Sequence, residues 1–292
     1  RAAAIWAAIK EFLTYGANSD PDAPRHWFYR HRLLIRITHW LNAIVLCVML
    51  MSGLQIFNAH SALYWGKGSN TDHPILSLTA IQDNDGTLKG ITQIGPWHFD
   101  TTGFLGASKV DGQMNVRGFP SWATIPGPQW LAMGRLWHFF FAWLFVTNGA
   151  IFAAYAFASG HFRRDLAPEA KDFAKLPSEI VHHAQLQFPK GEAAKTYNSI
   201  QRLTYFTVIF VLGPLIVLTG LTMSPTMDAA FPFLPWIFMG RQSARTIHFI
   251  CAFSFLAFFV VHIVMVVLSG TWNNIRSMIT GNYEIEEDGS HG

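Results

Sequence analysis

The sequence predicts an all-α membrane protein, a bundle of four membrane-spanning helices. Two properties of the composition favour this fold class, because 51% of the 292 residues are hydrophobic and only 13% are charged, a more apolar mixture than that of ordinary soluble domains. The third observation is a set of four apolar runs of about 20 residues or more, the length that crosses a hydrocarbon layer. The predicted spans cover residues 33–57, 130–158, 203–223 and 246–269.

The connecting segments differ in length and composition. Residues 1–32 carry apolar side chains at helical spacing over too few positions to cross a membrane, so we expect either a cytoplasmic segment lying on the membrane surface or a plain linker. Because the chain begins at Arg1, we expect the true start of the protein to lie further upstream. Residues 58–129 are rich in Gly, Pro, Asp and Trp, and a connection of this length is predicted to form an ordered docking cap rather than a disordered loop. The remaining segments are residues 159–202, 224–245 and 270–292.

Basic residues near the span ends predict the orientation. Lys and Arg favour the cytoplasmic side of a membrane protein, and here they lie before the first span, after the second, before the third and after the fourth. These residues are Arg25, Arg30, Arg32, Arg163, Arg164, Lys190, Lys195, Arg202 and Arg276. We therefore expect a multi-pass protein of the bacterial inner membrane with both termini in the cytoplasm, and with residues 58–129 and 224–245 on the periplasmic side.

Four of the thirteen histidines lie inside the predicted spans: His39, His138, His248 and His262. An ionisable side chain at membrane depth is costly, so each is a candidate functional residue, although any one alone could be a hydrogen-bonded packing residue. The directions of the spans place His39 level with His262 near the cytoplasmic side, and His138 level with His248 near the periplasmic side. His248 and His262 share one helix and are separated by about 21 Å along its axis, on nearly the same face.

These two level pairs of imidazoles predict two haem b groups. Each pair can supply both axial ligands of one haem iron, an arrangement that favours electron transfer over oxygen binding. Zinc is the competing metal, but it needs four ligands gathered at one place. Covalent attachment of haem is not expected, because the sequence contains no C-x-x-C-H word. We expect one haem between His138 and His248 and the other between His39 and His262.

Arginines and glycines near the histidines add to this prediction. Arg36, Arg135 and Arg245 each precede a proposed ligand by three residues, which places a guanidinium one turn nearer the membrane surface on roughly the same helix face. They are candidate partners of the haem propionates, and the alternative is that they are topology arginines that reach to the interface. Gly53 and Gly149 could each let a helix pass close to the macrocycle of the other level, although glycine is common in membrane helices anyway.

The motifs around these residues resemble those of a known family. Arg-Ile-Thr-His-Trp-Leu-Asn-Ala ends at Ala43, Gly-Arg-Leu-Trp-His ends at His138, and Arg-Thr-Ile-His ends at His248 and is followed by His262. The chain resembles the di-haem cytochrome b subunits of bacterial respiratory oxidoreductases, which include prokaryotic cytochrome b561, the nickel–iron hydrogenase cytochromes b and the formate dehydrogenase gamma subunits. The resemblance covers the whole four-helix core and implies the same pairing of the four histidines.

The resemblance also implies a quinone site and a partner protein. The formate dehydrogenase gamma subunits begin their third helix with a Tyr-Asn-x-x-Gln-basic word, and this chain has that word from Tyr197 to Arg202. Asn198 and Gln201 are therefore candidate hydrogen-bond partners of a quinone, and the alternative is an ordinary helix cap. The long outer segment makes the chain more similar to the thiosulfate-reductase-like cytochromes b561 that accompany periplasmic molybdopterin oxidoreductases. The partner expected on the outer loop is thus a periplasmic oxidoreductase subunit.

The predicted function is electron transfer across the membrane between that partner and quinone, in either direction, with no substrate-converting site of its own apart from the quinone site. One alternative is a stand-alone cytochrome b561-type quinone or superoxide oxidoreductase. An alternative of another class is a histidine-lined transporter or proton channel, which would need neither haem nor matched levels. A mere membrane anchor would not need histidines inside its spans. Nucleic-acid binding is not expected, because the net charge of +3 is small and the basic residues lie in short clusters.

Overall fold

The computed structural model describes residues 2–17, 19–20, 22–185 and 195–286. Lys190, one of the basic residues used to predict the orientation, lies outside the described residues, as do parts of the segments 159–202 and 270–292. Over these described residues the protein is mostly helical, and four helical stretches in them are long and apolar enough to cross a membrane. This confirms the predicted fold class.

The four candidate spans are α2 (Leu33–Phe57), α3 (Leu131–Ala158), the stretch Ser199–Thr222, and α9 (Arg241–Leu268). The third stretch consists of α5 (Ser199–Phe206), the π-helical turn η4 (Thr207–Leu212) and α6 (Gly213–Thr222). The widened turn comes just before Pro214, whose missing N–H removes one regular helical hydrogen bond and whose ring displaces the preceding turn. Both α9 and the third stretch begin several residues before the apolar runs of the sequence, because polar residues can form the first turn of a helix.

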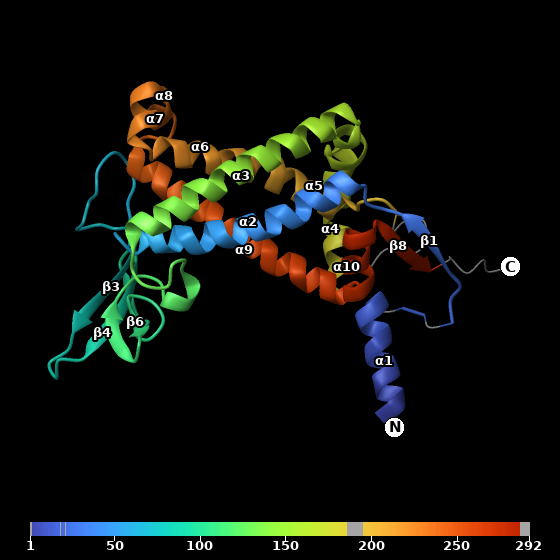
Figure 1. Cartoon of the computed structure of the whole chain (residues 1–292), viewed down its shortest axis with the longest axis horizontal. Coiled ribbons are helices and arrows are strands. Elements are labelled where there is room, and N and C mark those ends of the chain that lie inside the picture. The colour runs from blue at the N-terminus through green and yellow to red at the C-terminus, as the bar shows by residue number, and fades with distance from the viewer. Residues whose placement is uncertain (1, 18, 21, 186–194, 287–292) are drawn as a thin grey trace. The chain divides into compact units, whose positions relative to one another are not determined.

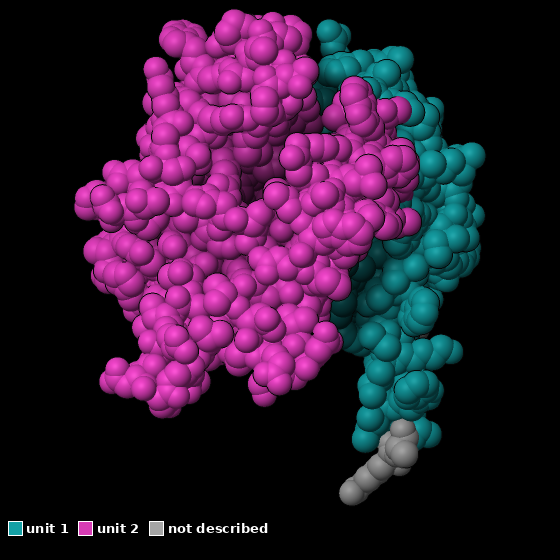
Figure 2. Space-filling model, turned by 60° about the vertical axis from the view of Figure 1, so that its left-hand side comes forward, with its two compact units in different colours: residues 1–40, 149–212, 254–292 teal, residues 41–148, 213–253 magenta. Residues whose placement is uncertain are grey.

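The chain divides into two compact units, shown in different colours in Figure 2. Unit 1 comprises residues 1–40, 149–212 and 254–292, and unit 2 comprises residues 41–148 and 213–253. Each of the four candidate spans contributes residues to both units. The division also separates the four intramembrane histidines, because His39 and His262 belong to unit 1, whereas His138 and His248 belong to unit 2.

Unit 2 contains the long segment between α2 and α3, which forms small antiparallel sheets (Figure 1). The strands β2 (Ala62–Leu63), β3 (Leu76–Gln82), β4 (Leu88–Ile94) and β5 (Trp97–Asp100) make a four-stranded sheet in that order, and β6 (Ala107–Val110) pairs with β7 (Gln113–Val116). Gly86, with a φ of 82°, provides the left-handed residue of the turn between β3 and β4. The sequence predicted order in this segment but no strands. The unit also contains the 3-10 turn η1 (Ser121–Ala123) and the short helices α7 (Pro225–Ala230) and α8 (Phe233–Ile237).

A cluster of aromatic and aliphatic side chains attaches this segment to the spans. Its buried members are Phe57, Leu63, Leu78 and Phe119, and Phe249 and Phe253 of α9 pack against them. Asn58 adds a pair of hydrogen bonds, since its Nδ2 donates to the Phe119 carbonyl at 3.1 Å and its Oδ1 accepts from the Phe119 amide at 2.6 Å. The segment between α2 and α3 is therefore fixed to the end of α2 and to the first half of α9 within unit 2.

Unit 1 contains both ends of the described chain. Its further elements are α1 (Ala2–Tyr15), β1 (Arg25–Tyr29), the π-helical turn η2 (Phe162–Leu166), α4 (Ala170–Ala184), α10 (Thr271–Thr280) and β8 (Asn282–Glu286). β1 and β8 form an antiparallel pair. This pairing was absent from the sequence analysis, because it joins residues more than 250 positions apart.

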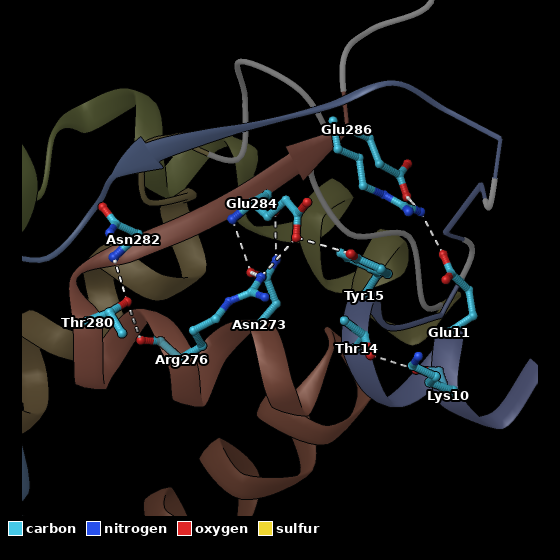
Figure 3. A network of polar contacts seen from close by, with 11 residues as sticks. Lys10, Glu11, Thr14, Tyr15, Asn273, Arg276, Thr280, Asn282, Glu284 and Glu286 are labelled. Atoms are coloured by element: carbon cyan, nitrogen blue, oxygen red, sulfur yellow. Dashed lines mark hydrogen bonds and ion pairs between the residues drawn. The ribbon is translucent and has the colours of Figure 1, made fainter. Parts of the chain in front are cut away.

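A polar network holds these terminal elements together (Figure 3). Asn273 of α10, which is 2% exposed, donates from Nδ2 to the Glu284 carbonyl at 2.7 Å and accepts from the Glu284 amide at 3.0 Å. The Glu284 carboxylate accepts from Arg276 at 3.0 Å and from the Tyr15 hydroxyl at 3.1 Å, which links β8 to α10 and α1. Arg25 of β1 pairs with Glu11 of α1 at 2.6 Å. The N-terminal helix α1 is thus joined to β1 and to β8, and through Glu284 of β8 to α10.

Candidate haem-binding site

The four intramembrane histidines face each other in two pairs. The ring centroids of His39 and His262 are 6.2 Å apart at an interplanar angle of 59°, and those of His138 and His248 are 6.3 Å apart at 60°. With metal–nitrogen distances of about 2 Å, a metal ion midway between two imidazoles places the ring centroids roughly 6 Å apart. The structure thus brings together the same two pairs as the sequence analysis, and both have a spacing that fits one iron with two axial imidazoles.

The donor set suits haem iron better than a zinc ion. In the part of the chain that the structure describes, no three His, Cys, Asp or Glu side chains gather into a group that could hold a metal. Structural zinc needs four such ligands, whereas haem iron takes its equatorial ligands from the macrocycle and only two from the protein. Pairs of histidines are therefore sufficient for haem and insufficient for zinc.

The imidazoles of the pair in unit 2 are each held by a hydroxyl from a neighbouring helix. His138 Nδ1 is 3.1 Å from Ser52 Oγ of α2, and His248 Nδ1 is 3.2 Å from Thr219 Oγ1 of α6. Both hydroxyls donate to backbone carbonyls of their own helix, at 2.7 Å and 2.8 Å. Because their protons are used in this way, the hydroxyl oxygens accept from the imidazole Nδ1–H groups. His248 Nδ1 also lies 2.9 Å from the Ile216 carbonyl. This tautomer leaves Nε2 of each ring as the metal ligand.

A glycine follows each of these hydroxyl residues and makes room for the ring. A Cβ placed on Gly53 would lie 3.3 Å from His138 Cε1, and one placed on Gly220 would lie 3.3 Å from His248 Cε1. Gly53 was predicted to allow a close approach at this level, and the structure shows that the imidazole itself approaches it. Ser52, Thr219 and Gly220 were missed. The recurrence of a small hydroxyl residue followed by glycine in two spans is the sequence signal that could have found them.

The pair in unit 1 has different surroundings. Within the described residues, His39 Nδ1 is buried without a hydrogen-bond partner, and the ring lies edge-on to Trp40 with centroids 5.3 Å apart. His262 stacks on Phe258 at 5.7 Å. Gly149 belongs to the same unit, and a Cβ placed on it would meet nothing within 4 Å. Gly149 is exposed, and its predicted closeness to a macrocycle stays a prediction.

The three arginines that precede the ligands have identified contacts. Arg36 donates to the Ile279 carbonyl at the end of α10, and Arg245 donates to the His60 carbonyl. Arg135 lies over the Phe139 ring, 5.6 Å from its centroid. Burial, together with the nearby Arg245, lowers the pKa of His60. In the structure, Arg36 and Arg245 therefore each donate a hydrogen bond to a backbone carbonyl of a distant segment. Their contact with propionates stays a prediction.

Asn198 and Gln201 form a reciprocal cap at the start of α5. Asn198 Oδ1 accepts a hydrogen bond from the backbone N–H of Gln201 at 2.8 Å, and Gln201 Oε1 accepts one from the backbone N–H of Asn198 at 3.3 Å. This is the helix cap that the sequence analysis held as the alternative to a quinone contact. The side-chain oxygens of both residues accept hydrogen bonds in the cap. A hydrogen bond to a quinone would therefore be donated by the side-chain nitrogens, Asn198 Nδ2 or Gln201 Nε2, and this contact stays a prediction.

Comparison with known proteins agrees with this geometry. The chain is 25% identical over 244 residues to the putative protein-methionine-sulfoxide reductase subunit YedZ1 of Azospira oryzae, a match that covers 82% of this chain and 90% of that protein. No solved structure matches the chain. The family model described as prokaryotic cytochrome b561 matches residues 30–281, a range that includes all four histidines and all four candidate spans. The match confirms the resemblance seen in the motifs, and the chain belongs to the prokaryotic cytochrome b561 family, whose members are haem b-binding membrane proteins of electron transfer.

Proposed function

We propose that the chain is a di-haem subunit that transfers electrons across the bacterial inner membrane, between a quinone at the cytoplasmic side and a redox partner in the periplasm. The observation that carries this proposal is the presence of two histidine pairs with nearly equal ring spacing, one in each unit. One helix, α9, supplies a histidine to each pair. Two haems related in this way would provide two successive electron carriers along the membrane normal.

The residues of the chain hold and tune the two haems. Haem supplies a reversible one-electron change at its iron, and the protein supplies ligands, burial and hydrogen bonds. His138 and His248 would bind the periplasmic-side haem through Nε2, with Ser52 and Thr219 fixing the two rings through Nδ1. His39 would bind the cytoplasmic-side haem together with His262.

The outer segment supports a periplasmic partner. Residues 58–129 form an ordered structure fixed to the spans, and its edge strand β5 exposes all four of its residues, including Trp97 and Phe99. Exposed aromatic side chains are frequent in protein interfaces. The relative YedZ1 is described as a subunit of a reductase. A partner of the molybdopterin oxidoreductase class, docked on this segment, is consistent with both observations.

The experiment that tests the proposal is a reduced-minus-oxidised optical spectrum of the detergent-purified protein, with haem counted per chain. We expect two haems b in the wild type and one in each of the variants His248→Ala and His262→Ala. His98→Ala is the matched control, because His98 is exposed on β5, and it should retain both haems. A protein without haem would overturn the proposal and favour the histidine-lined transporter. Two haems without any co-purifying periplasmic subunit would favour the stand-alone oxidoreductase.

A further inference from the structure

A polar cavity of about 140 Å³ lies in unit 1, where the chain enters α2. Four cationic side chains line it, and they come from separate parts of the chain. Two precede α2, one lies in η2 after α3, and one lies before α5. These residues are Arg30, Arg32, Arg164 and Lys195. The sequence analysis treated all four as topology residues, and nothing in the proposed electron transfer uses the cavity that they share.

The cavity has a large excess of positive charge. Among the described residues that line it, Asp165 is the single carboxylate, and it is already paired with His161 at 2.6 Å. No carboxylate of a described Asp or Glu lies within ion-pair distance of the guanidinium groups of Arg30, Arg32 or Arg164. Cations held around one polar space repel each other, so an anion bound between them would be stabilised.

The electrostatic environment of His31, which also lines the cavity, agrees with this excess. Burial, together with the positive charge of the neighbouring Arg30 and Arg36, lowers the pKa of His31 to about 3. The imidazole is therefore neutral at pH 7. A neutral imidazole can still donate one hydrogen bond, so it is compatible with an acceptor oxygen in the cavity.

The cavity extends towards the level of the histidine pair in unit 1. Ile35, which lines it, precedes His39 by four residues on α2 and so lies one helical turn nearer the cytoplasmic end. Tyr155 lines the cavity from α3 and follows Gly149, the glycine with open space at its Cβ position. Along the chain the four cations lie just outside the ends of the candidate spans, where basic side chains meet the polar headgroup region of a membrane.

We propose that this cavity is an oxyanion-binding site for a carboxylate or phosphate group at the cytoplasmic membrane surface. Two groups of this chemistry can reach it: the propionates of the haem between His39 and His262, and the phosphate of an anionic phospholipid. The first source rests on the proposed function, and the second does not. The site differs from the predicted propionate contact at Arg36, because that guanidinium donates to the Ile279 carbonyl.

The test compares the double variant Arg32→Gln/Arg164→Gln with the wild type and with Arg163→Gln. Arg163 is the matched control, because it belongs to the same turn η2 and is exposed outside the cavity. One measurement is redox-difference infrared spectroscopy on protein that contains haem labelled with ¹³C at the propionate carboxyls. The other is native mass spectrometry of protein from nanodiscs of phosphatidylglycerol, to count the lipids that stay bound.

If a haem propionate occupies the cavity, we expect the infrared bands of the labelled carboxylates to shift in the double variant and not in the control. A lipid source predicts that the double variant loses one bound phosphatidylglycerol per chain that the control retains. If neither the bands nor the lipid count changes, the proposal is wrong. Should the double variant fail to fold, the single variant Arg32→Gln gives the same comparison. The lipid count is readable on protein without haem, so a failure of the proposed function is distinguishable from a failure of this site.

Discussion

The hydroxyl of Thr219 offers a selective way to change one of the two proposed haems. Replacing Thr219 by Val keeps the volume of the side chain but removes the oxygen that accepts from His248 Nδ1 at 3.2 Å. An acceptor at Nδ1 makes the imidazole a more basic ligand, and a more basic ligand stabilises oxidised iron. We therefore expect the midpoint potential of the haem between His138 and His248 to rise in Thr219→Val.

The size of this shift follows from the geometry. One hydrogen bond is worth about 1 kcal/mol net, which corresponds to at most about 40 mV for a one-electron couple. The shift should be smaller than this limit, because His248 Nδ1 keeps the Ile216 carbonyl at 2.9 Å as a second acceptor. An optical redox titration of the purified protein measures both midpoint potentials in one experiment.

Thr222→Val is the matched control for this titration. Thr222 lies one turn further along α6, is as fully buried as Thr219, and donates to the Leu218 carbonyl at 2.8 Å, but the structure gives its hydroxyl no contact with an imidazole. We expect Thr222→Val to leave both potentials unchanged. The reasoning is refuted if Thr219→Val shifts both haems equally, if it lowers the potential, or if the control shifts it by the same amount.

Three further outcomes are expected. Gly220→Leu should lose the periplasmic-side haem, because even a Cβ at this position lies 3.3 Å from His248 Cε1; a haem count per chain that stays at two would contradict this. Gly149→Leu should lose the cytoplasmic-side haem while Gly149→Ala retains it, because the space beside Gly149 is open and we assign it to the macrocycle; equal haem content in the two variants would argue against that assignment. Asn273→Ala should lower the unfolding temperature, because it removes the two hydrogen bonds to the backbone of Glu284. The free energy of unfolding should fall by about 2–3 kcal/mol, which scanning calorimetry in detergent measures. An unchanged transition would show that the network in Figure 3 contributes little to stability.

The sequence predicted the spans and the histidine pairs because both depend on strong local signals. A run of about 20 apolar residues has few alternatives to a membrane helix, and histidines are rare enough in such runs to stand out. Span direction then placed His39 level with His262 without knowledge of any contact. The Tyr-Asn-x-x-Gln word was ambiguous for the opposite reason, because Asn198 and Gln201 are as common in helix caps as in ligand sites.

The features that were missed depend on contacts between distant parts of the chain. Arg36 donates to Ile279, a residue 243 positions away, and no local pattern announces such a partner. Ser52 and Thr219 resemble any hydroxyl residue that bonds back to its own helix, and only the glycine that follows each of them distinguishes them in the sequence. The strands β3 and β4 alternate apolar and polar residues over part of their length. The short β2 and β5 form strands only because they pair with β3 and β4.

The central claim is that electrons cross the membrane through two haems held by this chain. The most direct test is electron transfer across sealed proteoliposomes, with ferricyanide trapped inside and dithionite added outside, followed by the loss of ferricyanide absorbance. We predict transfer by the wild type and by the control His98→Ala, and none above empty vesicles by His248→Ala or His262→Ala, because each of these variants lacks one of the two carriers. Wild-type protein that loads two haems and yet transfers no electrons, or single-haem variants that transfer them as fast as the wild type, would contradict the account.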